Sequence, residues 1–161
     1  MIRSCLRSAA VSALVLMLST TARASTVSYC LSAPNSVGSG AHISWAGPVT
    51  THGPHSGSLV VRGCPRNSYG VFLYGLHADR TPFGDGYGCI GGANWRLARK
   101  YTAADGTVTL NLRREGVPED LRWLNYHYHE TWYFQYLYRD VSGPGGTGFN
   151  LTDGLEVRFE S

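Results

Sequence analysis

Two histidines in the C-terminal half, His127 and His129, have the spacing of a metal-ligand pair. In an extended strand, residues two apart point to the same face, so both imidazoles would lie on one side. Metal-binding β-barrels with such a pair add a carboxylate four or five residues later, but Tyr133 and Phe134 occupy those positions. A third ligand would have to come through the fold from His42, His52, His55 or His77. We therefore favour ordinary surface histidines, and a calcium or transition-metal cofactor is an alternative that we do not favour.

The residues that perform nucleophilic or acid–base catalysis do not form a recognisable set. The chain has no Gly-x-Ser-x-Gly motif, and no histidine can be paired with Cys64 from the sequence. The eleven acidic residues are scattered and nominate no pair of carboxylates for glycoside hydrolysis. We expect a protein that is not an enzyme, with a metal-dependent enzyme using His127 and His129 as the last alternative.

Four polar residues flank a glycine-rich loop near the C-terminus: Arg139, Asp140, Asn150 and Asp153. Their oxygens suit a calcium site or a sugar-binding cleft. Asp and Asn side chains also bond to nearby backbone in turns, and a partly buried arginine pairs with a carboxylate. We favour the second, structural interpretation.

Aromatic residues provide the best indication of function. Trp123, Tyr126 and Tyr128 cluster beside His127 and His129, and aromatic rings of this kind stack on sugars or anchor partner proteins. We predict a carbohydrate-binding platform at these three residues, although most aromatics in the chain must belong to the core.

The first 24 residues have the pattern of a signal peptide. Arg3 and Arg7 precede a short apolar stretch at residues 9–18, and Ala22-Arg23-Ala24 is a cleavage signal. Ten apolar residues are too few to cross a bilayer as a helix, which takes about 20. We predict removal of residues 1–24 and a single domain at residues 25–161, which is secreted, on the cell surface or in the periplasm.

Cleavage changes the charge balance. The full chain has 14 basic and 11 acidic residues, and three of the arginines leave with the signal. The remainder has 14 − 3 = 11 basic residues against 11 acidic ones, and a formal net charge of zero. This balance predicts neither nucleic-acid binding nor membrane insertion of the cleaved protein.

Short strands separated by turns are expected throughout the remaining chain. Candidate strands lie at residues 25–30, 42–45, 59–62, 69–74, 94–99, 107–112, 130–140 and 155–159, and a glycine-rich loop is expected at residues 80–92. This pattern predicts an all-β fold, an antiparallel β-sandwich of the jelly-roll or immunoglobulin-like type with seven to nine short strands.

The stretch at residues 130–140 is expected to be the central strand. Trp132, Phe134, Tyr136 and Tyr138 share one face, while the opposite face also carries bulky groups. The strand at residues 155–159 alternates cleanly and is expected to lie beside it.

The motifs along the chain resemble those of a β-sandwich module found at the ends of many exported bacterial proteins. They are Tyr29-Cys30, Asn35-Ser36, and the segments at residues 70–75, 82–86, 89–92, 131–135, 138–140 and 148–155. The resemblance covers nearly the whole chain after the signal, except residues 50–57 and 122–130, and it brings no catalytic residues. Some relatives have a cysteine at the position of Tyr136 or close to the C-terminus, and this chain has neither.

Three cysteines remain after cleavage, and the sequence alone allows three pairings. The resemblance implies that Cys30 and Cys89, which lie in matching motifs, form a disulfide and that Cys64 stays free.

The expected function is that of an exported binding or surface-assembly module with a carbohydrate ligand. The alternative is a structural or adhesive module that binds another protein and has no small ligand. The expected partner is therefore a cell-surface or extracellular polysaccharide or protein.

Overall fold

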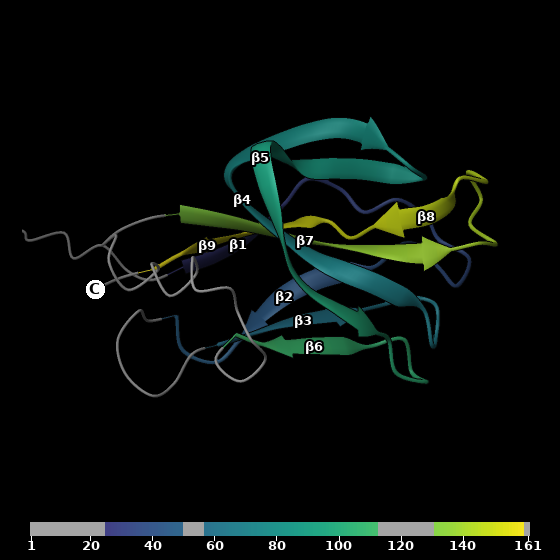
Figure 1. Cartoon of the computed structure of the whole chain (residues 1–161), viewed down its shortest axis with the longest axis horizontal. Coiled ribbons are helices and arrows are strands. Elements are labelled where there is room, and N and C mark those ends of the chain that lie inside the picture. The colour runs from purple at the N-terminus through teal and green to yellow at the C-terminus, as the bar shows by residue number, and fades with distance from the viewer. Residues whose placement is uncertain (1–24, 50–56, 113–130, 160–161) are drawn as a thin grey trace, which may run out of the picture.

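The computed structural model describes residues 25–49, 57–112 and 131–159, and in these ranges the chain is entirely β-structure and turns (Figure 1). Nine strands form two antiparallel sheets, which confirms the predicted β-sandwich. The described ranges contain no helix long and apolar enough to cross a membrane. The predicted signal peptide lies outside them, so export stays a prediction.

The larger sheet has six strands in the order β1-β9-β7-β4-β5, with β8 also pairing with β7. Their bounds are Ser25–Tyr29 for β1, Gly154–Arg158 for β9, Thr131–Asp140 for β7, Tyr69–Phe83 for β4, Gly86–Tyr101 for β5 and Gly148–Leu151 for β8. The smaller sheet has the order β2-β3-β6, with bounds His42–Ala46, Ser58–Arg62 and Val108–Asn111.

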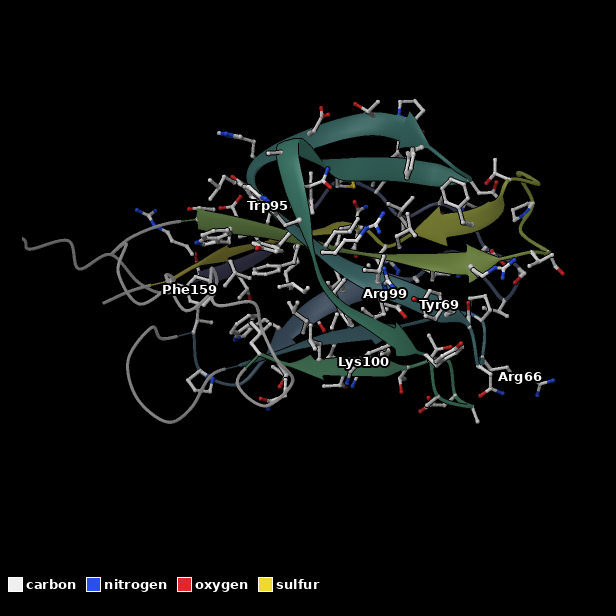
Figure 2. All side chains as sticks on the ribbon, viewed as in Figure 1. Arg66, Tyr69, Trp95, Arg99, Lys100 and Phe159 are labelled. Carbon is white, nitrogen blue, oxygen red and sulfur yellow. A yellow bond between two sulfur atoms is a disulfide. The ribbon has the colours of Figure 1, made fainter. Side chains whose placement is uncertain are left out.

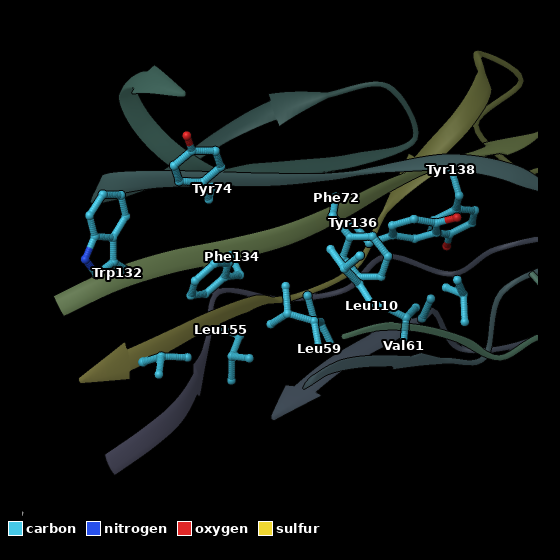
Figure 3. Close-up of a cluster of buried hydrophobic side chains, with 14 of the residues drawn as sticks. Leu59, Val61, Phe72, Tyr74, Leu110, Trp132, Phe134, Tyr136, Tyr138 and Leu155 are labelled. Carbon is cyan, nitrogen blue, oxygen red and sulfur yellow. The ribbon is translucent and has the colours of Figure 1, made fainter. Parts of the chain in front are cut away.

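Strand β7 is the centre of the larger sheet, as predicted. Strand β4 pairs along one side of it, and β9 and β8 share the other side. Trp132, Phe134, Tyr136 and Tyr138 are all buried on the face that meets the smaller sheet (Figure 3). The period-two alternation in the sequence therefore placed four aromatic side chains in the core.

The core lies between the two sheets. Phe72 packs on Tyr136 with ring centroids 4.6 Å apart, and Leu59, Val61 and Leu110 close the core from the smaller sheet (Figure 3). Each fully buried apolar side chain of this size contributes about 1.5–3 kcal/mol. The aromatic layer on one sheet and the aliphatic layer on the other hold the sandwich together.

Strands β8 and β9 follow one another in the sequence and both pair with β7. Thr152, in the gap between them, continues the hydrogen bonding to β7. Its N–H donates to the Tyr136 carbonyl at 3.0 Å, and its Oγ1 accepts from the Tyr136 N–H at 3.1 Å. The side chain thus replaces a backbone acceptor, so the backbone of β7 stays paired where its neighbour changes from β9 to β8.

The prediction of a loop at residues 80–92 is wrong. Strands β4 and β5 continue through this stretch as a long hairpin, and the turn is confined to Gly84 and Asp85. The pairing shifts register near His77 and again before Thr81, and the hairpin bends over the rest of the sheet (Figure 1). Glycines here allow bends and a turn residue with φ of 61° at Gly84, and they do not end the strands.

The disulfide joins Cys30 and Cys89 with their Cα atoms 6.1 Å apart, which confirms the pairing that the resemblance implied. It connects the end of β1 to β5. Cys64 is free and buried in the core, and burial raises the pKa of its thiol to about 12.

Candidate functional site

The residues predicted to bind a ligand lie outside the described ranges. Trp123, Tyr126 and Tyr128, together with His127 and His129, all fall within residues 113–130. Their roles therefore stay predictions. The described residues contain no group of three or more His, Cys, Asp or Glu side chains that could hold a metal ion.

Of the four polar residues around the glycine-rich loop, Asp140, Asn150 and Asp153 are buried and bonded to backbone. Asp140 accepts from the Ser36 N–H at 3.0 Å, and Asn150 donates to the Pro34 carbonyl at 2.9 Å. These contacts tie β7 and β8 to the segment between β1 and β2.

Asp153, in the gap between β8 and β9, contacts residues of β1 and β2. Its carboxylate accepts from the Ile43 N–H at 2.8 Å and from the Ser28 hydroxyl at 2.7 Å, and it lies 3.2 Å from Nδ1 of His42. The larger sheet is thereby fastened to β2 of the smaller sheet.

Arg139 behaves differently from these three residues. Its side chain is exposed and makes no ion pair or hydrogen bond with any residue that the structure describes. Asp140 follows Arg139 in the strand and points to the other face of β7, so it is not the partner of this arginine.

A buried amide that the sequence analysis did not select holds the hairpin to β7. Nε2 of Gln135 donates to the carbonyls of Tyr87 and Thr152, both at 2.8 Å, and Oε1 accepts from the Cys89 N–H at 2.9 Å. Its position between Phe134 and Tyr136, as a polar residue in an otherwise bulky apolar strand, was the available signal. Because all its hydrogen-bonding groups are occupied, Gln135 has a structural role.

Asp85, at the tip of the hairpin, holds the glycine-rich loop. Its Oδ1 accepts from the N–H of Thr147 at 2.9 Å and from its hydroxyl at 2.6 Å. These bonds lower the pKa of the Asp85 carboxyl. Its other oxygen, Oδ2, and Oδ1 of Asp140 are both buried without a hydrogen-bond partner in the described part of the chain.

The face of the larger sheet turned away from the core forms a surface that we call the outer face. Directly opposed residues in antiparallel strands have their side chains on the same side. Tyr69 is opposite Tyr101, Val71 is opposite both Arg99 and Leu137, and Leu73 is opposite Arg96. The outer face therefore carries Tyr69, Val71, Leu73, Arg96, Arg99, Tyr101, Leu137 and Arg139.

Two tyrosines stand at one end of the outer face. Tyr101 is 68% exposed and meets Tyr69 edge to face, with ring centroids 5.2 Å apart. They line a hollow of about 460 Å³ together with Ser36, Pro65, Asn67, Ser68, Arg139, Asp140, Val141 and Ser142. This hollow combines an aromatic wall with hydroxyl, amide and guanidinium groups.

A second hollow, of about 310 Å³, lies further along the outer face beneath the bent hairpin. Val71, Leu73 and Leu137 form its floor, and Phe83 and Arg96 are among its other lining residues. The nearest lining residues of the two hollows are two positions apart along β4, at Tyr69 and Val71, which is about 7 Å. Arg99 lies opposite Val71, next to this step.

Comparisons of this chain with protein-family models, with curated proteins and with solved structures find no match.

Proposed function

We propose that this protein is a binding module without catalytic activity and that its ligand is a carbohydrate held on the outer face. The observation that carries the proposal is Tyr101, an aromatic residue that is 68% exposed at the wall of a polar hollow. A ring in this position can stack on the apolar face of a sugar, while the polar lining bonds to its hydroxyl groups.

The ring is also held in place before any ligand arrives. Edge-to-face contact with Tyr69 restricts Tyr101, and both residues lie in paired strands. A restricted side chain loses little conformational entropy on binding. The predicted platform at Trp123, Tyr126 and Tyr128 would be a separate contact, and it is tested separately.

The test is a glycan array followed by titration calorimetry on the best ligand. Tyr101→Ala is expected to weaken binding about tenfold, because it removes apolar contact worth roughly 1.5 kcal/mol. Tyr87→Ala, which changes another tyrosine of β5 at a distance from the 460 Å³ hollow, is the matched control and should bind normally.

A triple alanine variant of Trp123, Tyr126 and Tyr128 tests the sequence-based platform in the same assay. Absence of binding to any glycan, or unchanged binding by Tyr101→Ala, would contradict the proposal of a sugar site at Tyr101.

A second candidate function is self-assembly through the edge of the larger sheet. In the described part of the chain β1 pairs only with β9, and its residues Ser25–Tyr29 include no charge that would prevent pairing with another strand. Val27 is 51% exposed. Sedimentation velocity should then show association that rises with concentration and disappears in Val27→Lys. A strict monomer would rule out this function.

A further inference from the structure

We propose that the carbohydrate is acidic: a linear chain of uronic acids whose carboxylates bind to Arg96, Arg99 and Arg139. This inference rests on the proposed function and adds to it the chemical class of the ligand.

The first step is where the three arginines lie. Arg99 is opposite Val71, which is itself opposite Leu137, and Arg139 is two residues beyond Leu137 on the same face. Arg139 and Arg99 thus lie two strands apart, about 10 Å across the sheet. Figure 2 shows Arg99 next to Tyr69, so the positive charge adjoins the tyrosine pair.

The second step is that these three guanidinium groups have no partner among the described residues and outnumber the carboxylates that line the hollows. All three side chains are exposed, and none makes a hydrogen bond, ion pair or ring contact with the part of the chain that the structure describes. Two carboxylates line the hollows: Asp140, which is buried and accepts from the Ser36 N–H, and Asp79, which accepts from the Thr81 hydroxyl. A local positive surface is therefore present although the chain from residue 25 has no formal net charge.

The third step is the match to a carboxylated sugar. A guanidinium group binds a carboxylate with two parallel hydrogen bonds, and such charged bonds are stronger than neutral ones. The two hollows adjoin along the outer face, so one chain can run from Tyr101 past Arg99 to Arg96. The tyrosine pair at one end of this path and the guanidinium groups that follow it suit a polymer with a ring and a carboxylate in every unit.

Titration calorimetry of the full chain with oligogalacturonate is the test, and the fully methyl-esterified oligomer is the control. Esterification removes the charge and keeps the sugar backbone. We expect the acid form to bind at least tenfold more tightly and to lose this advantage as NaCl is raised from 50 to 500 mM, because salt screens exposed charges.

Arg99→Gln should weaken binding of the acid form about tenfold and leave binding of the ester unchanged. Arg96→Gln and Arg139→Gln should behave in the same way. Arg62→Gln, on the exposed side of β3 in the other sheet, is the matched control and should have no effect. Circular dichroism melting curves verify that each variant is folded.

The outcomes separate the two proposals. Equal binding of acid and ester would overturn the acidic class and leave the carbohydrate function standing. Equal binding of poly-glutamate would overturn it as well, since any polyanion would then suffice. If neither the acid nor the ester oligomer binds and the glycan array shows no binding, the carbohydrate function and the acidic ligand class are both wrong.

Discussion

At Gly70 of β4, one added methyl group would overlap the ring of Tyr136. A Cβ atom built there would lie 2.4 Å from the Tyr136 hydroxyl oxygen and 2.6 Å from the Leu137 carbonyl. The Tyr136 hydroxyl crosses this position to donate to the Lys100 carbonyl at 2.9 Å. The glycine thus allows the central strand to bond with β5, two strands away.

Gly70→Ala is therefore expected to lower the free energy of unfolding by about 1–3 kcal/mol, the usual cost of overpacking a core. Urea denaturation measures it. Gly88→Ala is the matched control in β5, since its nearest atoms would be 3.8 Å from the new methyl group. Equal stability of the two variants would show that the Tyr136 ring can move aside.

Asp85 is expected to make the stability of the fold depend on pH in the acidic range. Its hydrogen bonds to Thr147 lower its pKa in the folded state from the ordinary value of 3.8. A lowered carboxyl pKa contributes stability that is present above about pH 4 and lost as the pH falls through the folded value. The melting temperature of Asp85→Asn should lie below that of the unchanged protein at pH 6, and the difference should shrink by pH 3. A difference independent of pH would contradict this role.

At the scale of elements, the bent β4–β5 hairpin joins several parts of the molecule. Its tip is held by Asp85 to the loop before β8, and the disulfide from Cys89 links it to the end of β1. Gln135 bonds it to the central strand. The hairpin also covers part of the outer face and so forms the second hollow.

Removing the disulfide should destabilise the protein substantially. The bond joins residues 59 positions apart, and in the chain-entropy model a loop of this length restricts the unfolded chain by about 4 kcal/mol. The double variant Cys30→Ser, Cys89→Ser is expected to lose an amount of this order in urea denaturation. Dithiothreitol should destabilise the unchanged protein similarly and leave the double variant unaffected. A loss under 1 kcal/mol would be inconsistent with this account.

At the scale of the whole molecule, three tyrosine hydroxyl groups are shielded from solvent by the fold. Tyr136 and Tyr138 are fully buried, and Tyr29 donates to the Cys89 carbonyl. Desolvation by burial raises the pKa of all three above the ordinary value of 10. The sandwich therefore favours the neutral form of each.

We expect alkaline unfolding as a consequence. A raised tyrosine pKa contributes stability that is complete below the unfolded value near 10 and is lost as the pH rises above it, at up to about 1.4 kcal/mol per pH unit for each group. Absorbance at 295 nm should show these three tyrosines ionising together with the loss of the circular dichroism signal. Their ionisation near pH 10 in a folded protein would contradict the prediction.

The sequence was sufficient for those features that depend on local alternation. The period-two pattern at residues 130–140 identified the central strand and grouped its four core aromatics on one face, and the pattern at residues 155–159 identified its neighbour. The bulky groups on the opposite face suggested a strand covered on both sides, whereas Leu137 is only partly buried there and Arg139 is exposed. It failed at residues 80–92, where glycines were taken to mark a loop. Glycine allows unusual backbone angles in a bent strand as well as in a loop, and the local sequence does not distinguish the two.

The outer face was decided by tertiary structure alone. Arg96 and Arg99 are about 40 residues from Arg139, and Tyr101 is more than 30 residues from Tyr69. Only Arg139 was selected from the sequence, and it was assigned to the polar residues around the glycine-rich loop and not to a surface shared with the other residues. They meet because core packing sets the register of β5 on β4 and of β4 on β7. The balanced total charge concealed the positive surface for the same reason: a sum over the chain contains no information about which strands become neighbours.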